Sequence, residues 1–236
     1  MKKGDRSAAC REEKKHMYIR NKTASIIWKV VLLVLGAWAL LDGAGILAGH
    51  YTRNFPHMFT NISNLAAWVY FLCALIWLIT RKEPQDGVPF LPVFKYTVTI
   101  SLLVTMIIAH FMLFNAMFKD GHLVWCLVIL HYVAPCMTLL DWLLFDQKGK
   151  MPVWGPFAWI SLGVGYLAFT MIYVGVFGRY MGGGTTADLT PYPYDFLDPS
   201  IKGTGTVIGF CAAMIVAFIV LGYVLLGVDH LMGRKK

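Results

Sequence analysis

Charged residues are scarce in this chain of 236 residues, and their scarcity decides its class. Asp, Glu, Lys and Arg make up 14% of the sequence, whereas hydrophobic residues make up 58% and the mean hydropathy is +0.61. A soluble globular domain carries roughly 25% charged residues. The composition therefore excludes a disordered chain, a coiled coil, a collagen-like fibre and an ordinary cytosolic domain. It indicates a single bundle of apolar helices in a membrane.

Cysteines are also few, and their spacing indicates no covalent framework. The five cysteines contain no Cys-x-x-Cys motif. Four of them fall inside apolar runs, where a thiol behaves as a small apolar side chain: Cys73, Cys126, Cys136 and Cys211. We therefore expect no disulfide framework.

Six apolar runs are long enough to cross a bilayer, because about 20 helical residues span roughly 30 Å of hydrocarbon. They lie at residues 26–49, 55–80, 95–118, 123–145, 156–178 and 204–228. The predicted fold class is all-α, a polytopic membrane protein with six transmembrane helices in one bundle. A basic leader at 1–25 precedes this 26–228 domain, and a basic tail at 229–236 follows it.

The basic residues predict how the spans are oriented. Most of the 21 Lys and Arg residues lie in the leader, in the tail and in the loops on their side of the membrane. The opposite loops hold Arg53, Lys119, Arg179 and Lys202. Because positively charged segments stay in the cytoplasm, we expect both termini to be cytoplasmic. The net charge of +8 thus indicates membrane topology and not a nucleic-acid partner.

Four polar side chains fall at similar depths on four different spans. Counted from the non-cytoplasmic end at about 1.5 Å per residue, Asp42, His110 and His131 lie about 12 Å deep and Thr60 about 8 Å deep. Ionisable side chains within a bilayer are costly and mark candidate functional sites. By contrast, Asp141 lies near the cytoplasmic end of its span, where we expect it to pair with a lysine or cap a helix.

Thr60 and His131 are the candidate nucleophile and base. Thr60 opens the second span, where unpaired backbone N–H groups and the helix dipole stabilise negative charge. Asn64 shares its helix face and is a candidate oxyanion donor. Pro135 removes the donor for the carbonyl of His131, which predicts a kink beside the imidazole. A hydroxyl and a neutral imidazole at matching depth are the minimum for nucleophilic catalysis.

The same polar layer allows two other functions. A threonine in a membrane helix commonly bonds its own i−4 carbonyl, which would leave a lipid-binding or transport protein without catalysis. His110, His131 and Asp42 also permit a haem or metal redox site, although a second intramembrane histidine pair is missing. For an esterase, Asp42 or His110 would instead orient the imidazole, and we expect no metal or cofactor.

The loop at 179–203 combines glycines, prolines and aromatic residues before the last span. Tyr192, Tyr194 and Phe196 make it a candidate lid or substrate-entry wall over the outer mouth of the bundle. An ordered loop with interfacial tyrosines is the simpler alternative.

Three short motifs resemble a known family. Phe59-Thr60 at the start of the second span, Leu130-His131 on the fourth span, and Tyr-Pro-Tyr-Asp-Phe-Leu-Asp at 192–198 are similar to the androgen-induced protein family and its bacterial six-helix relatives. Eukaryotic members are membrane hydrolases that cleave fatty acid esters of hydroxy fatty acids with a threonine nucleophile and a histidine. The resemblance implies that Thr60 and His131 take these roles.

The bacterial branch is the more similar one, because Asn61, Ser63 and Asn64 follow the threonine and a long leader precedes the first span. The resemblance implies an integral protein of the plasma (inner) membrane of a bacterium. It further implies a fatty acyl ester as substrate, entering sideways from the outer leaflet of the bilayer. The acyl chain and the alcohol of that ester stay open.

Overall fold

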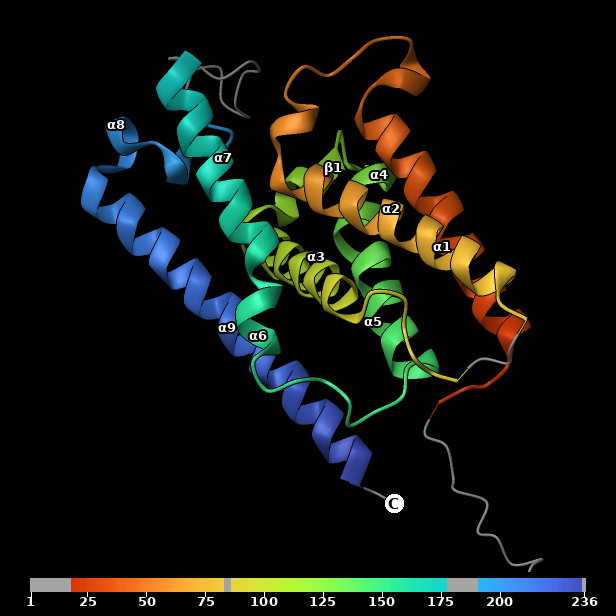
Figure 1. Cartoon of the computed structure of the whole chain (residues 1–236). Helices are drawn as coiled ribbons and strands as arrows, with labels where there is room; N and C mark the ends of the chain where they lie inside the picture. Colours follow the sequence, from red (N-terminus) through yellow and green to blue (C-terminus); the bar gives the residue numbers. More distant parts are fainter. Residues whose placement is uncertain (1–17, 83–85, 178–190, 235–236) are drawn as a thin grey trace, which may run out of the picture.

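The computed structural model describes residues 18–82, 86–177 and 191–234 (Figure 1). Most of the predicted basic leader, the first part of the 179–203 loop and the last two residues lie outside the described residues. Within the described part, six helices are long and apolar enough to cross a membrane. The predicted all-α bundle of six spans is thereby confirmed, and the chain has the architecture of an integral membrane protein.

Three of the spans are single continuous helices of similar length, and a fourth is longer. They are α1 (Lys22–Gly43), α2 (Phe59–Thr80), α3 (Pro92–Met112) and α9 (Thr204–Arg234). The start of α1 and the end of α9 lie at the same end of the bundle (Figure 1).

The two remaining spans are interrupted. The fourth span consists of α4 (Trp125–Val128), a π-helix η4 (Ile129–Val133) and α5 (Ala134–Phe145). The fifth consists of α6 (Gly155–Trp159) and α7 (Ser161–Phe177).

Short elements join the spans at the end of the bundle opposite the termini. They are the 3₁₀ helices η1 (Ile46–Ala48), η2 (Phe55–His57), η3 (Phe114–Met117) and η5 (Asp195–Leu197), the hairpin of β1 (Phe118–Lys119) and β2 (His122–Leu123), and α8 (Pro199–Lys202).

The first span ends six residues before the predicted boundary at residue 49. Gly45 and Gly49 adopt φ angles of +78° and +75°, which place them in the left-handed region. Glycine reaches this region without steric cost, so each of them stops helical continuation. Hydropathy alone could not reveal these stops, because the residues between them are apolar.

Helix α3 is the central helix of the bundle and its most buried span. It packs against α2 on one side and against α5, α6 and α9 on the others. The core beside it contains Tyr96, Trp142, Trp159 and Phe218, all of which are buried. The helices are therefore arranged around α3, and residues facing α3 are shielded from lipid.

Helices α6 and α9 pack closely, whereas α7 diverges from α9 towards the end that carries α8 (Figure 1). At the close contact, a Cβ atom on Gly222 would lie 2.9 Å from the Cβ of Pro156, so this crossing requires glycine. The break between α6 and α7 then directs α7 away from α9. The two spans are therefore furthest apart at the end of the bundle where α2 starts (Figure 1).

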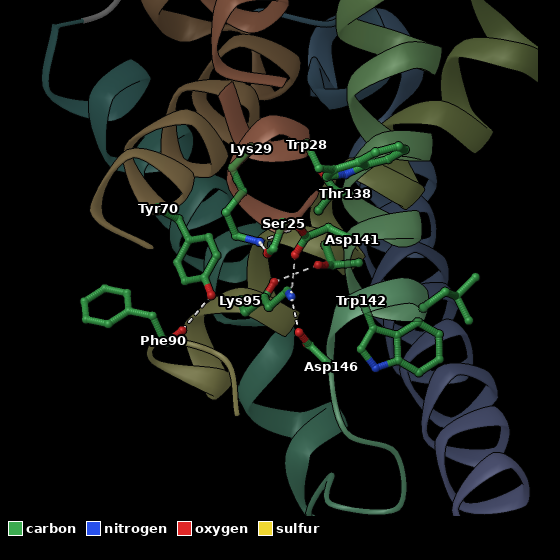
Figure 2. A network of polar contacts seen from close by, with 12 residues as sticks. Ser25, Trp28, Lys29, Tyr70, Phe90, Lys95, Thr138, Asp141, Trp142 and Asp146 are labelled. Atoms are coloured by element: carbon green, nitrogen blue, oxygen red, sulfur yellow. Dashed lines mark hydrogen bonds and ion pairs between the residues drawn. The ribbon is translucent and has the colours of Figure 1, made fainter. Parts of the chain in front are cut away.

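A buried ion network joins α1, α3 and α5 near the end that carries the termini (Figure 2). The carboxylate of Asp141 accepts from the Nζ of Lys29 at 2.7 Å and from that of Lys95 at 2.6 Å. Lys95 also donates to Asp146 at 2.7 Å. Asp141 is fully buried, so its charge depends on these partners. The expectation that Asp141 pairs with a lysine is confirmed.

Candidate active site

Thr60 and His131, which the sequence places on separate spans, are in contact in the structure. The hydroxyl oxygen Oγ1 of Thr60 lies 3.2 Å from the Nε2 atom of His131. Both residues are buried, with 9% and 6% of their surface exposed. Thr60 is the second residue of α2, and His131 is the middle residue of the π-helix. Equal depth along the spans therefore corresponds to a direct side-chain contact.

The second hydrogen bond of the imidazole fixes its tautomer. The Nδ1 atom of His131 lies 2.8 Å from the carbonyl oxygen of Leu127. A carbonyl oxygen can only accept, so Nδ1 carries the proton and Nε2 presents its lone pair to Thr60. The hydroxyl of Thr60 then donates to Nε2. A base at Nε2 can remove the hydroxyl proton only in this arrangement. Leu127 holds the imidazole in place, as the orienting group of a catalytic triad does.

A π-turn presents His131 at this position. The N–H of Ala134 donates to the carbonyl of Ile129, five residues earlier, and Pro135 has no N–H to continue the pattern. The carbonyl of Leu130 instead accepts from the Nδ2 of Asn64 at 3.1 Å. The sequence predicted that Pro135 would free the carbonyl of His131. In the structure the carbonyl left free is that of Leu130, one residue earlier, because N–H groups in the π-turn pair with the carbonyl five residues back instead of four. This carbonyl accepts from Asn64 on α2.

Asn64 is a structural tie between the elements that carry Thr60 and His131. Its amide nitrogen donates to the carbonyl of Thr60 at 2.8 Å as well as to that of Leu130. Both amide protons are therefore used, and none is left for an oxyanion. The expected oxyanion role of Asn64 does not agree with this geometry. Asn64 holds the start of α2 against the π-helix and so sets the distance between Thr60 and His131.

Asp42 and His110, the two candidates for orienting the imidazole, bond elsewhere. Asp42 lies next to the thiol of Cys126 on α4. His110 is exposed, and its Nδ1 lies 3.2 Å from the hydroxyl of Tyr132. The backbone carbonyl of Leu127 occupies the position that the sequence assigned to them. A backbone acceptor of this kind leaves no signal in the sequence.

His110, His131 and Asp42, the side chains that could have bound a metal ion, do not come together in the structure either. Within residues 18–82, 86–177 and 191–234, no group of three or more His, Cys, Asp or Glu side chains is placed to hold a metal ion. A metal site built from His110, His131 and Asp42 therefore has no geometric support in these ranges.

Thr60 lines a cavity of about 100 Å³, whereas His131 is not among its lining residues. The walls come from α2, α3, α7, η5 and α9 and from residues next to α3, α7 and η5, so the cavity lies between α7 and α9. Most of its lining is apolar: Phe59, Ile108, Leu113, Ile160, Val164, Leu167, Phe196, Leu197, Phe210, Met214, Ile215 and Phe218. Its few polar side chains include the Thr60 hydroxyl. An apolar cavity of this kind accepts a hydrocarbon chain.

The 191–198 segment closes one wall of this cavity. Tyr194 and Phe196 line it, as expected for an entry wall, whereas Tyr192 is not among the lining residues. The phenol oxygen of Tyr194 accepts from the N–H of Phe59 at 3.0 Å. Burial raises the pKa of the Tyr194 phenol above its ordinary value, so the hydroxyl keeps its proton at neutral pH.

Two further residues support the site and were missed in the sequence. His57, three residues before Thr60, is buried against the rings of Phe169 and Tyr173 on α7. The hydroxyl of Tyr166 donates to the backbone carbonyl of His57 at 2.9 Å. These contacts anchor the start of α2 to α7. The position of His57 next to Thr60 was the available signal.

The fold and the site define a class of protein: a six-span helical membrane protein with a buried threonine–histidine pair at the wall of an apolar cavity. Comparison with protein-family models, with curated proteins and with solved structures found no match. The resemblance to the androgen-induced protein family is therefore carried by the three motifs.

Proposed function

We propose that this protein is a membrane-embedded esterase that hydrolyses a fatty acyl ester with Thr60 as nucleophile and His131 as base. The observation that carries the proposal is the 3.2 Å contact between the Thr60 hydroxyl and the His131 Nε2 lone pair. A threonine that served only its own helix would bond an i−4 carbonyl. Its bond to an imidazole of fixed tautomer supports a catalytic role.

The reaction proceeds in two halves. The Oγ1 of Thr60 attacks the ester carbonyl carbon while its proton passes to Nε2 of His131. Collapse of the tetrahedral intermediate breaks the bond to the alcohol oxygen, and Nε2 returns the proton to the departing alcohol. Water then attacks the acyl-threonine with His131 again as base. This second half releases the fatty acid and restores the Thr60 hydroxyl.

The surroundings of Thr60 support a lipid as the substrate. The cavity is apolar and is lined from both α7 and α9, which diverge at this end of the bundle (Figure 1), so we expect it to open sideways towards lipid. A long acyl chain enters such a space without crossing water. Fatty acid esters of hydroxy fatty acids are the substrate class that the family resemblance suggests. With both termini in the cytoplasm of a bacterial cell, the substrate comes from the outer leaflet of the inner membrane.

The test is turnover by purified protein in detergent. A panel of long-chain and branched fatty acyl esters should release free fatty acid, and a long-chain alkyl fluorophosphonate should form an adduct on Thr60, detected by peptide mass spectrometry. Saturable binding of the same esters without turnover or adduct would instead indicate a lipid-binding or transport protein.

The apolar cavity should determine which acyl chains are accepted. Replacing Cys211, which lines the cavity from α9, by tryptophan fills much of the available space. We expect kcat/KM for long-chain esters to fall about 10-fold or more, because the chain loses its pocket, while short-chain esters remain substrates.

The matched control is Ile208→Trp on the same helix, because Ile208 is 64% exposed and is not among the lining residues. The measurement is the ratio of kcat/KM values for a long-chain and an acetyl ester. An equal ratio in both variants would show that the acyl chain binds elsewhere.

A further inference from the structure

Attack by Thr60 creates a negatively charged oxygen in an apolar cavity, and this oxygen needs a hydrogen-bond donor. The donors expected from the sequence are already engaged. Asn64 uses both amide protons on carbonyl groups. The N–H groups of Asn61 and Ile62 donate to the carbonyl of Met58 at 3.0 and 3.1 Å. The N–H of Phe59 donates to Tyr194. The backbone N–H of Thr60 is itself a neighbour of the Tyr194 phenol oxygen, so the oxyanion needs a donor beyond these groups.

The hydroxyl of Tyr194 is in the required position. It lines the same cavity as Thr60, and its oxygen is a hydrogen-bond partner of the N–H at the start of α2. The backbone N–H and the hydroxyl of Thr60 are also polar neighbours of this phenol oxygen. In the tetrahedral intermediate, the negatively charged oxygen is attached to the carbon that is bonded to the Oγ1 of Thr60. A donor that neighbours Oγ1 can therefore reach that oxygen.

The hydrogen bonds of Tyr194 also set the direction of its proton. A phenol has one O–H donor and oxygen lone pairs that accept. The phenol oxygen accepts from the backbone N–H of Phe59, which leaves its O–H to donate on the cavity side, where the hydroxyls of Thr60 and Tyr166 are its polar neighbours. An N–H at a helix N-terminus withdraws electron density from the phenol oxygen and makes its O–H a stronger donor.

We propose that Tyr194 is a third catalytic residue, which donates its phenol O–H to the carbonyl oxygen of the ester as Thr60 attacks. This role rests on the proposed esterase function. As the C–O bond to Thr60 forms, the carbonyl electron pair moves to oxygen and the Tyr194 hydrogen bond to it shortens. The proton stays on Tyr194. When the intermediate collapses, the electron pair returns to the carbonyl and the hydrogen bond lengthens again.

Aromatic packing holds Tyr194 ready for this role. Its ring stacks on Phe196 with centroids 4.9 Å apart and planes 10° apart, and Phe196 packs on Phe210 of α9 with centroids 4.4 Å apart. The segment then ends at Asp198, a buried residue that caps α8 by accepting from the N–H of Ser200 at 2.8 Å. A donor fixed before the reaction stabilises the transition state without reorganisation.

The test begins with Tyr194→Phe, which keeps the stacked ring and removes the donor. We expect kcat for a good ester substrate to fall about 10²–10³-fold with KM changed only a few-fold, because the lost interaction is made mainly in the transition state. The matched control is Tyr70→Phe, which removes a buried tyrosine hydroxyl that donates to the backbone carbonyl of Phe90 outside the cavity, and which should lower kcat less than about 10-fold. Thermal unfolding of both variants reports whether each is folded.

A second measurement separates donation from helix capping, since Tyr194→Phe also leaves the N–H of Phe59 without its acceptor. Incorporation of 3,5-difluorotyrosine at position 194 keeps the oxygen and acidifies the phenol. A catalytic donor is lost when it ionises, so the alkaline limb of the kcat–pH profile should move to lower pH. A tyrosine that serves only as a cap leaves this limb unchanged.

The outcomes distinguish this inference from the proposed function. Wild-type turnover together with an unchanged kcat in folded Tyr194→Phe would overturn the role of Tyr194 and leave the esterase intact. An alkaline limb unmoved by difluorotyrosine would also overturn it, even if Tyr194→Phe fails to fold. Absence of both turnover and a Thr60 adduct in the wild type would instead overturn the esterase itself.

Discussion

Replacing Thr60 by alanine should abolish ester hydrolysis, with kcat/KM lowered about 10³-fold or more, because the acyl group then has no nucleophile to accept it. Thr60→Ser should retain measurable turnover, since a primary hydroxyl can still donate to His131 and attack the ester. The measurement is release of fatty acid by purified, folded variants under identical detergent conditions.

The matched control is Thr105→Ala. Thr105 lines the same cavity, but its hydroxyl donates to the backbone carbonyl of Ser101 at 2.9 Å and is not bonded to an imidazole. Its removal should change kcat/KM only a few-fold. If Thr60→Ala hydrolysed esters as fast as Thr105→Ala does, Thr60 would not be the nucleophile.

His131→Ala extends this prediction, because a nucleophile and its base act as one unit. The loss in His131→Ala should approach that in Thr60→Ala, and the double variant should be little worse than either single variant. If the fold-losses of the two single variants multiplied in the double variant, the two residues would act independently. That result would contradict the role inferred from their direct contact.

Replacing Asp141 by asparagine should have the largest effect on stability. The change removes the counter-charge that Lys29 and Lys95 share, so among the described residues Lys29 keeps no ion-pair partner and Lys95 keeps only Asp146. Breaking a buried ion pair by removing one partner costs about 3–5 kcal/mol. We expect a correspondingly lower unfolding temperature, measured by intrinsic tryptophan fluorescence during heating in detergent.

Asp229→Asn is the control for this change. Asp229 is also fully buried, and its Oδ2 accepts from the N–H of Met151 at 3.1 Å. In the described residues it forms no ion pair, and an asparagine oxygen can accept the same bond. Its replacement should cost less than about 1 kcal/mol. Equal losses in the two variants would mean that burial of a carboxylate, and not its pairing with lysines, governs the effect.

The ion network and the Thr60–His131 pair lie at different levels of the bundle. On α3, Lys95 in the network and Thr105 at the cavity are ten residues apart, or about 15 Å along the helix. An Asp141→Asn protein that stays folded at low temperature should therefore keep its esterase turnover. Loss of turnover in the folded variant would show that the network also positions the site.

The sequence by itself determined the class of the protein. Apolar runs of span length fix six membrane helices, because a bilayer accepts backbone only when its hydrogen bonds are satisfied internally. The same reasoning identified Thr60 and His131, since polar side chains at one depth of an apolar bundle have few structural reasons to be there. Asp141 was likewise expected to pair with a lysine. All of these depend on local composition and on position along a helix.

Other features depend on how the helices are rotated and packed, which the sequence does not state. The π-turn at Ile129–Val133 and the carbonyl of Leu127 fix the imidazole, but a backbone acceptor has no residue type to reveal it. Asn64 looked like an oxyanion donor on its helix face until the packing directed both amide protons to carbonyls.

The tertiary structure alone also brought Tyr194 to the start of α2, across 135 residues of chain. Lys29 and Lys95 converge on one carboxylate for the same reason, because α1, α3 and α5 pack together at that level. Depth along a span can be counted from the sequence, since a helix rises by a fixed amount per residue. Contact around the bundle cannot be counted in this way, because it is set by the packing of side chains from distant parts of the chain.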